Sequence, residues 1–156
     1  MVQTSAQGLF DQKLPDDGVV TLAFYEPEDA VELCEMDSDP EHRRRFEFPQ
    51  DFIPSVSYSE KVIAGWTHAR EIGERFAFAV RDLATRELLG GCELRPLDAR
   101  VANLSYWTFP RHRSRGIASR AVALACQVAF SQLGLKCVEI VVDPDNHASR
   151  RVAIRN

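Results

Sequence analysis

The sequence predicts an α/β fold: one mixed sheet, made of an antiparallel meander and a parallel β-α-β crossover, with helices on its faces. The first observation is that residues 75–110 hold three β-forming segments separated only by short, turn-like joints, which is typical of a meander. The second is that a broad apolar helical stripe, starting at Ile117, leads into the nearly continuous apolar run "KCVEIVVDP". A length of 156 residues suits one such domain with a single core.

The domain is expected to begin with a strand and a broken helix. Residues 1–18 are polar and contain glycine, proline and aspartate, which predicts a loosely held lead-in to a single domain over residues 19–156. Val19–Tyr25 is rich in β-forming residues and predicts the first strand. The next segment, "EPEDAVELCEMDSDPEHRRRF", has acids in its first turn and predicts a helix that is interrupted at Asp39-Pro40 and ends in an exposed "EHRRRF".

A second helix and the meander follow an irregular, aromatic connection, "FEFPQDFIPSV". In "YSEKVIAGWTHAREIG", the residues Val62, Ile63 and Trp66 share one helical face, and Gly73 predicts the end of the helix. The meander strands are then predicted in "RFAFAVRD", which alternates cleanly, and in "TRELLGGCELRPL" and "VANLSYWTF".

The crossover and a last helix complete the described pattern. Ile117, Leu124 and Val128 belong to the apolar stripe of a helix that is predicted to end at Leu133-Gly134. "KCVEIVVDP" is expected to be an interior strand beside a parallel neighbour. Asn146 is a favourable N-cap for a helix in "NHASRRVAIRN". The predicted order is therefore β-α-α-β-β-β-α-β-α.

Composition and charge argue against several classes of function. The net charge is -4 and the pI is near 5.6, so a basic surface for nucleic acid is not expected. The N-terminus lacks the charged-then-apolar pattern of a secretory signal, and no run approaches the roughly 18 apolar residues of a membrane span. The four cysteines form no C-x-x-C pair, which argues against a metal site. These features predict reduced thiols in a cytoplasmic protein that binds neither membrane nor nucleic acid.

The stretch "RHRSRGIASRA" (residues 111–121) concentrates four arginines and a histidine at the start of a predicted helix. A helix N-terminus offers unpaired N–H groups and the positive end of the helix dipole, so it attracts anions and disfavours cations. Gly116 and Ala118 leave room for a bulky anion, and Arg113 and Arg115 can add charge-assisted hydrogen bonds. A phosphate or pyrophosphate site is predicted; the alternative is a solvated basic turn with Ser114 as N-cap.

Two motifs in this region carry a family resemblance. "RSRGIA" resembles the R/Q-x-x-G-x-G/A loop with which GNAT acetyltransferases bind the pyrophosphate of acyl-CoA, and "SYWTFPRHRSRGIASRAVALA" resembles a longer pattern of one GNAT branch. "DPDNHASRRVAIRN" is similar to a second pattern of that branch, which contains N-terminal acetyltransferases of ribosomal proteins. The resemblance runs from about Val20 to the end, and Ser114 departs from a frequent glycine. The family pattern continues with two further strands, so the sheet is expected to lack its C-terminal strands, and a partner chain in a homodimer is one candidate to support it.

The resemblance implies a set of residues that bind acetyl-CoA, without a metal. The pyrophosphate is expected on the N–H groups of seven consecutive residues: Arg113, Ser114, Arg115, Gly116, Ile117, Ala118 and Ser119. The pantetheine arm is expected in a gap between the fourth and fifth strands, beside Trp107, Thr108 and Phe109. Asn146 is expected to contact the pantetheine, with a plain helix N-cap as the alternative.

The chemistry that the resemblance implies is direct attack of a primary amine on the thioester of acetyl-CoA. Many relatives protonate the leaving thiolate with a tyrosine seven residues after the asparagine, where this chain has Ala153; Ser149 is therefore the predicted acid, and a helix-surface serine is the alternative. Glu93 and Glu139 are candidate bases because they are acids on predicted strands. His112 and His147 lie near the cofactor loops and are expected to be solvated.

The acceptor is predicted only as a primary amine, on a protein N-terminus or on a small molecule. Phe46–Phe52 either lines the acceptor site or packs onto the core. The main alternative function is a non-catalytic acyl-CoA-binding or regulatory module, favoured by the alanine at position 153. A nucleic-acid-binding module that uses the arginine loop is disfavoured by the negative net charge.

Overall fold

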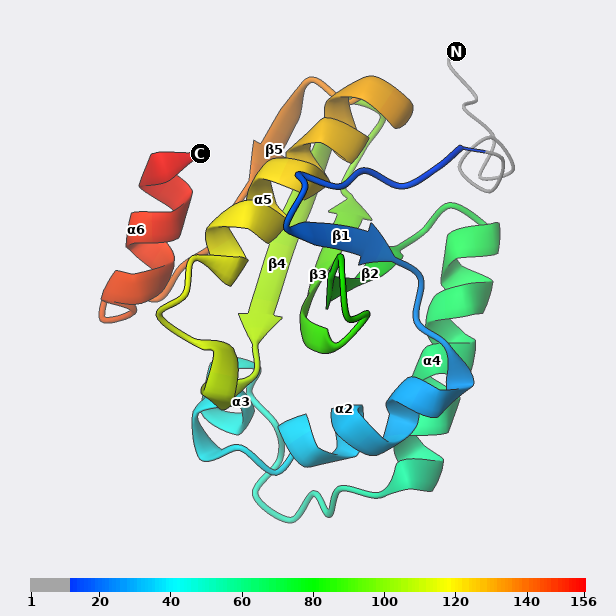
Figure 1. Cartoon of the computed structure of the whole chain (residues 1–156), viewed down its shortest axis with the longest axis vertical. Helices are drawn as coiled ribbons and strands as arrows, with labels where there is room; N and C mark the ends of the chain where they lie inside the picture. The colour runs from blue at the N-terminus through cyan, green and yellow to red at the C-terminus, as the bar shows by residue number, and fades with distance from the viewer. Residues whose placement is uncertain (1–11) are drawn as a thin grey trace.

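The computed structural model describes residues 12–156 (Figure 1). Residues 1–11 of the predicted lead-in lie outside the described residues. The remainder of the lead-in is held to the domain, because Leu22 N–H donates to the Pro15 carbonyl (3.1 Å) and Arg120 pairs with Asp17 (2.7 Å). The strands are β1 (Val20–Ala23), β2 (Phe76–Asp82), β3 (Leu88–Pro96), β4 (Val101–Thr108) and β5 (Cys137–Glu139). The helices are α2 (Ala30–Met36), α3 (Pro40–Arg45), α4 (Val56–Glu71), α5 (Ile117–Gln127) and α6 (His147–Arg155), with short 3-10 turns at Pro27–Asp29 and Pro110–His112.

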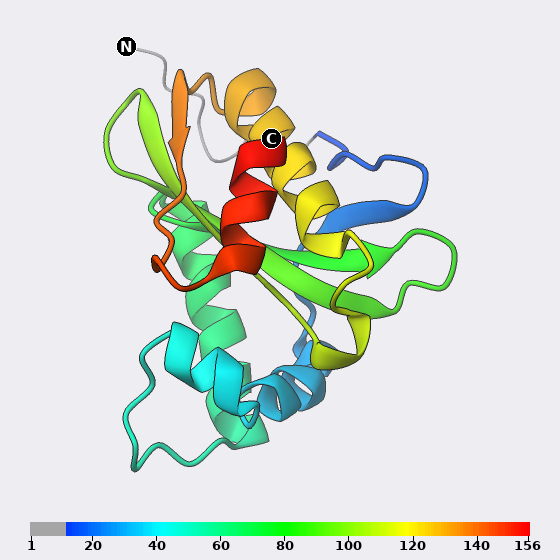
Figure 2. The same cartoon turned by 90° about the vertical axis from the view of Figure 1, so that its left-hand side faces the viewer.

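The strands form one mixed sheet in the order β1-β2-β3-β4-β5, antiparallel as far as β4 and parallel between β4 and β5. This arrangement confirms the predicted meander and crossover. Helix α5 packs across one face of the sheet with α6 beside it, and α2 and α4 cover the other face (Figures 1 and 2).

The predicted interruption between the first helices is confirmed. The Asp39 side chain caps α3 by accepting a hydrogen bond from His42 N–H (2.9 Å), and Pro40 occupies the first helical position, where its missing N–H costs nothing. After α5, a π-helical turn (Val128–Gln132) carries the chain to Gly134, whose φ of 67° ends the helix as the sequence predicts.

The core lies mainly between the sheet and α5, where Phe78, Leu94 and Val122 are fully buried. The opposite face is shaped by one close approach. A Cβ at Gly91 would lie 2.6 Å from Nε1 of Trp107, so only glycine leaves room for this indole beside the strand. The position of Trp107 beside α2 and α3 thus depends on the "GG" in β3.

The last strand differs from the prediction of a long interior strand. Strand β5 has only three residues, pairs with β4 alone, and is an edge of the sheet within the described chain. The apolar run continues past Glu139 but leaves the sheet, and Val141 is 84% exposed. The hydrophobicity of residues 140–142 predicted that they would be buried in the sheet. They leave the sheet because the pairing of β4 and β5 ends at Glu139.

Candidate functional site

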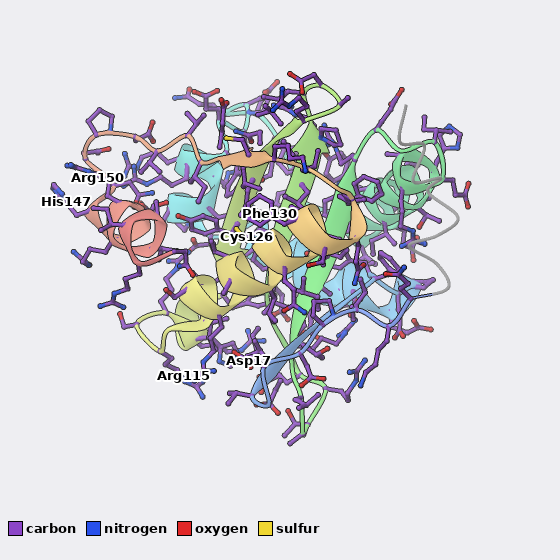
Figure 3. All side chains as sticks on the ribbon, turned by 90° about the horizontal axis from the view of Figure 1, so that it is seen from above. Asp17, Arg115, Cys126, Phe130, His147 and Arg150 are labelled. Carbon is purple, nitrogen blue, oxygen red and sulfur yellow. The ribbon has the colours of Figure 1, made fainter. Side chains whose placement is uncertain are left out.

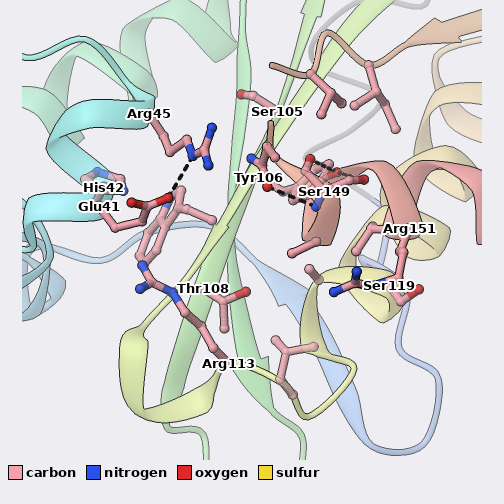
Figure 4. A pocket seen from close by; sticks show the side chains of 18 of the residues that line it. Glu41, His42, Arg45, Ser105, Tyr106, Thr108, Arg113, Ser119, Ser149 and Arg151 are labelled. Atoms are coloured by element: carbon pink, nitrogen blue, oxygen red, sulfur yellow. Dashed lines mark hydrogen bonds and ion pairs between the residues drawn. The ribbon is translucent and has the colours of Figure 1, made fainter. Parts of the chain in front are cut away.

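A cleft of about 770 Å³ opens along the end of β4. Its floor is β4 from Leu104 to Thr108. One wall, here called the α3 wall, consists of Glu41, His42, Arg45, Phe46 and Glu47. The other, the α5–α6 wall, consists of the loop and first turn of α5 together with α6 and the segment that leads to it (Figure 4).

The floor exists because β4 and β5 separate. Their pairing ends at Asn103 and Glu139, while β4 continues for five more residues to Thr108. Beyond Glu139, residues 140–142 line the opposite side of the cleft. Within the described chain, no strand pairs with this part of β4 on the β5 side. Main-chain groups of β4 are therefore available to an extended ligand.

The start of α5 is an uncapped helix N-terminus that faces the cleft. Gly116 is the N-cap residue, and no side chain of the described residues caps this end. The first helical hydrogen bond runs from Arg120 N–H to the Gly116 carbonyl (3.1 Å), which leaves the preceding N–H groups of the turn for an anion. The alternative in which Ser114 is the N-cap is wrong.

The loop before α5 needs two left-handed residues, Ser114 (φ 60°) and Gly116 (φ 75°). A Cβ at Gly116 would meet nothing within 4 Å, so the glycine is required by its backbone conformation and not by crowding from the chain. Ser114 adopts the same region at a cost that a glycine would not have.

The basic residues of the loop have partners. Arg113 donates to Oδ2 of Asp39 (2.9 Å), which joins the two walls. Arg115 donates to Nδ1 of His112 (2.9 Å), and the other ring nitrogen of His112 lies 3.0 Å from Oε1 of Glu87. His112 is only 5% exposed, so the expectation that it is solvated is wrong. This chain of polar contacts, with the buried His112 at its centre, fixes the turn that leads into α5.

Most of the predicted site residues meet at the cleft. Its lining contains ten of them: Trp107, Thr108, Arg113, Ser114, Gly116, Ile117, Ala118, Ser119, Asn146 and Ser149. Arg115 and Phe109 lie outside the lining. Phe109 is 2% exposed and packs with Met36 and Leu88, with its ring 5.2 Å from that of Trp107. It can thus support Trp107 but offers no surface to the cleft.

Helix α6 presents a hydroxyl pair to the cleft. Asn146 caps α6 by accepting a hydrogen bond from Ser149 N–H (3.1 Å). The Ser149 hydroxyl lies 2.5 Å from the phenol oxygen of Tyr106, which also donates to the Ser149 carbonyl (3.1 Å; Figure 4). Burial raises the pKa of Tyr106, and the bond to Ser149 partly offsets this. The sequence prediction gave the Tyr106 side chain no role, although the alternation of Leu104, Tyr106 and Thr108 on one face of β4 could have indicated one.

The α3 wall is built around a buried histidine. His42 is 8% exposed and packs against Phe46, Phe48 and Trp107, with ring centroids 4.7, 5.6 and 5.8 Å away. The prediction that "EHRRRF" is an exposed end is therefore wrong at its histidine. Nδ1 of His42 is buried without a hydrogen-bond partner among the described residues. Burial lowers the pKa of His42 to about 4, so its imidazole is neutral at pH 7.

Asp37 lies beside this imidazole, with Oδ1 3.7 Å from Nε2 of His42. Burial raises the pKa of Asp37 to about 6, against the opposing influence of Arg43. Burial therefore favours the uncharged form of both groups, the base His42 and the acid Asp37, in the same small region.

An ion-pair network connects the α3 wall to the segment before α6. Arg45 binds Oε1 of Glu41 on its own helix (2.8 Å; Figure 4). It also binds Asp143 (3.1 Å) and Asp145 (3.0 Å) on the segment before α6. The bond to Arg45 lowers the pKa of Glu41 and that of Asp145. The partners lie about a hundred residues apart in the chain, so no local sequence pattern could predict this connection.

The candidate bases of the sequence analysis do not line the cleft. Glu93 lies on β3 next to Arg75 (3.4 Å), and burial raises the pKa of this carboxyl. Glu139 and His147 are exposed, and His147 points outward from α6 (Figure 3). Within residues 12–156, no cluster of metal-ligating side chains is found, and no helix is long and apolar enough to cross a membrane.

Comparisons with known proteins agree with this geometry. Residues 20–156 match the family described as "Acetyltransferase (GNAT) domain". The N-acetyltransferase p20 of Bacillus licheniformis, itself uncharacterized, is 29% identical over 132 residues, which is 83% of this chain and 73% of that protein.

Solved structures share the fold. The ribosomal L7/L12 alpha-N-protein acetyltransferase RimL in complex with coenzyme A has a TM-score of 0.80 at 17% identity, over 92% of this chain and 82% of that one. Spermidine N-acetyltransferase from Vibrio cholerae, in complex with CoA and spermine, has a TM-score of 0.75 at 20% identity, over 88% of this chain and 79% of that one.

Proposed function

Because the chain belongs to the GNAT family of acetyltransferases, we propose that it transfers the acetyl group of acetyl-CoA to a primary amine, on a protein N-terminus or on a small molecule. The observation that carries the proposal is the uncapped start of α5, which faces the cleft next to the unpaired end of β4. An anion-binding turn followed by an open strand suits a ligand with a pyrophosphate at one end and an extended, amide-bearing arm.

In this proposal the pyrophosphate lies on the N–H groups between Ser114 and Ser119, and Arg113 adds positive charge at the same turn. The pantetheine arm follows β4 from Thr108 toward Leu104, pairing with main-chain groups that β5 leaves free. This places the thioester near Tyr106 and Ser149, where the strands part.

The acceptor amine approaches from the α3 wall. Glu41 and Glu47 line this wall and are exposed, so it favours a cationic amine over an acid. The two enzymes whose solved structures are named above are acetyltransferases of a ribosomal protein and of spermidine, so enzymes of this fold use both peptide and polyamine acceptors. The choice between them in this chain depends on the α3 wall, which the cofactor does not occupy in the proposed arrangement.

The cofactor claim can be tested at Gly116. Gly116→Ala adds only a methyl group, but alanine cannot hold φ at 75° without strain. The affinity for acetyl-CoA, measured by calorimetry, should therefore fall at least 10-fold. Gly134→Ala is the matched control: Gly134 has φ 67°, also has nothing within 4 Å of its Cβ position, and lies outside the cleft. Both variants should lose about 1 kcal/mol of stability, and only Gly116→Ala should lose affinity. Equal affinity in the two variants would exclude this turn as the cofactor site.

A second candidate function is a non-catalytic module that binds acyl-CoA. It is favoured by the position of Glu93 and Glu139 outside the cleft lining, which leaves the base unassigned. The two functions separate in an assay of thiol release from acetyl-CoA with a panel of peptides and amines. Binding of acetyl-CoA without thiol release in the presence of any peptide or amine of the panel would favour the non-catalytic module. Turnover with a single amine would exclude the module.

A further inference from the structure

The tyrosine that is absent from α6 at Ala153 has a counterpart that comes from β4. Tyr106 reaches the cleft from the strand, and its phenol oxygen contacts both the hydroxyl and the carbonyl of Ser149. Figure 4 shows the two side chains joined across the gap between β4 and α6. Helix α6 therefore supplies a serine at the cleft, and the strand supplies a phenol directly behind it.

The chemistry of the leaving group explains why a phenol matters. A thiol has a pKa of about 8.5 and a phenol a pKa of about 10. The pKa of a free phenol is therefore only roughly 1.5 units above that of the thiol formed when it protonates the thiolate. An aliphatic hydroxyl carries one O–H donor but is a far weaker acid than a phenol, so it transfers its proton to a thiolate only when a second donor replaces that proton. Burial keeps the Tyr106 phenol protonated at neutral pH, since its pKa is raised. A serine that is backed by a phenol is thus a better proton source than either the serine or water at this position.

We propose that Tyr106 supplies, through the Ser149 hydroxyl, the proton that the CoA sulfur takes up as the thioester breaks. The inference rests on the proposed acetyl transfer. In the transfer, the new C–N bond forms, the C–S bond breaks and its electron pair stays on sulfur. The phenol O–H lies within hydrogen-bond distance of both the carbonyl and the hydroxyl of Ser149, and in this step it turns from the carbonyl to the hydroxyl. Sulfur takes the proton of the Ser149 hydroxyl, the Ser149 oxygen takes the proton of Tyr106, and the phenolate recovers a proton from the one that the acceptor amine releases to water. Protons and electrons therefore balance over one turnover.

In this arrangement Ser149 touches the reacting sulfur, and Tyr106 acts through it as a positioning residue. The two oxygens work in series, so removing either one should have the same consequence as removing both. A purely structural role, in which Tyr106 only holds α6 to β4, makes a different prediction, because it would affect every substrate equally.

The test uses Tyr106→Phe, which removes only the phenol oxygen, with Tyr58→Phe as the matched control on an exposed part of α4 that is outside the cleft lining. With acetyl-CoA and an accepted amine, Tyr106→Phe should lower kcat 10- to 100-fold and leave KM for acetyl-CoA within about twofold. Ser149→Ala and the double variant should show the same loss within about twofold. Loss of activity of the wild type at high pH, where the phenol ionises, should disappear in Tyr106→Phe.

The leaving group provides the readout that a structural role would not move. An acetyl thioester of a nitro-substituted aromatic thiol releases a thiolate that needs no proton, so Tyr106→Phe should use it as fast as the wild type does. An equal loss with both thioesters, or a kcat within twofold of the wild type with acetyl-CoA, would overturn the inference. A wild-type chain that binds acetyl-CoA but releases no thiol with any amine would overturn the proposed function first, and this inference with it.

Discussion

The two walls of the cleft are built from different parts of the polypeptide. The α5–α6 wall offers main-chain N–H groups, held by the left-handed conformations of Ser114 and Gly116. The α3 wall offers side chains, held by contacts with residues from several other elements, such as Trp107 and Asp143. A backbone site depends on a few adjacent residues, whereas a side-chain site depends on the whole fold. The first can be recognised from a short sequence, and the second cannot.

The walls also differ in electrostatics. The start of α5 is positive because of its dipole, and no described carboxylate lies in its first turn, although Asp39 pairs with Arg113 nearby. The α3 wall contains a buried neutral histidine, with the partly buried carboxyl of Asp37 beside it, and a network of ion pairs. A change of charge at α5 should therefore act on cofactor affinity, and changes at α3 should act on stability, on its pH dependence and on local motion.

The largest expected effect comes from Ser119→Asp. An acid in the first turn is favourable for the helix, so the melting temperature of the free protein should stay the same or rise. The same acid would lie beside the proposed position of the pyrophosphate, so the Kd for acetyl-CoA should rise at least 100-fold, which corresponds to about 2.8 kcal/mol. Calorimetry and thermal melts measure both quantities on one sample. The matched control is Ser131→Asp, on the exposed surface after α5, which should leave the Kd unchanged.

Loss of affinity together with a lower melting temperature would mean that Ser119→Asp had damaged the helix. In that case the contrast between a charge-sensitive α5–α6 wall and a packing-dependent α3 wall would lose its main support. The contact from Asn156 to the Ser119 hydroxyl (3.2 Å) is not at risk, because an aspartate oxygen accepts the same hydrogen bond.

The second prediction concerns pH and the pair Asp37 and His42. The folded-state pKa of His42 is depressed to about 4, so its contribution to stability is present above pH 6.5 and is lost as pH falls toward 4. The folded-state pKa of Asp37 is raised to about 6, so its contribution is present below pH 3.8 and is lost as pH rises through 6. The two slopes oppose each other between pH 4 and pH 6, and each amounts to about 3 kcal/mol over its full window.

Single variants should expose each slope. Relative to the wild type, Asp37→Asn should lose stability on going from pH 7 to pH 4, because only the histidine slope remains. His42→Phe, which fits the aromatic surroundings, should gain relative stability over the same range. Urea unfolding at pH 4, 5, 6 and 7 measures the difference curves. Parallel curves for all three proteins would show that neither group is held away from its ordinary pKa.

These predictions depend on how much of the molecule a sequence can reveal. The order of elements, the break at Asp39, the helix end at Gly134 and the turn at Gly116 all follow from local conformational preferences, and the structure has them. The length of β5 did not follow, because apolar residues after Glu139 do not show where two strands separate. The burial of His42 did not follow either, because it depends on Trp107 from β4 as well as on the nearby Phe46 and Phe48, and a sequence does not show that β4 lies against α3.

The predictions for the cofactor residues and the predictions for the base differ in how well they match the cleft lining. Expectations about the cofactor side named residues of which most meet at one cleft, whereas Phe109 is buried and Arg115 is exposed outside the lining. Expectations about a base named Glu93 and Glu139, which lie on strands but outside the cleft. A residue type on a predicted strand does not determine which way it faces at a site, whereas glycine and a helix start determine a backbone shape directly.

The smallest expected effect is at Arg45, which ties α3 to Asp143 and Asp145 on the far side of the cleft. These acids are exposed, so the ion pairs should be weak and screened by salt. Arg45→Met keeps the aliphatic stem and should make α3 amides exchange faster with deuterium at low salt, while α5 amides and the Kd for acetyl-CoA stay unchanged. Arg44→Met is the matched control, because Arg44 makes only longer contacts, 3.3 Å to Glu41 and 3.6 Å to Asp145.

High salt should bring the wild type close to Arg45→Met, since it removes the same interactions without a mutation. A difference in exchange that persists at 1 M salt would show that the stem of Arg45 acts by packing and not by charge. Faster exchange in α5 as well would show that the two walls move as one unit. The comparison between an independent cofactor wall and a separately held α3 wall would then have to be replaced by a single mobile cleft.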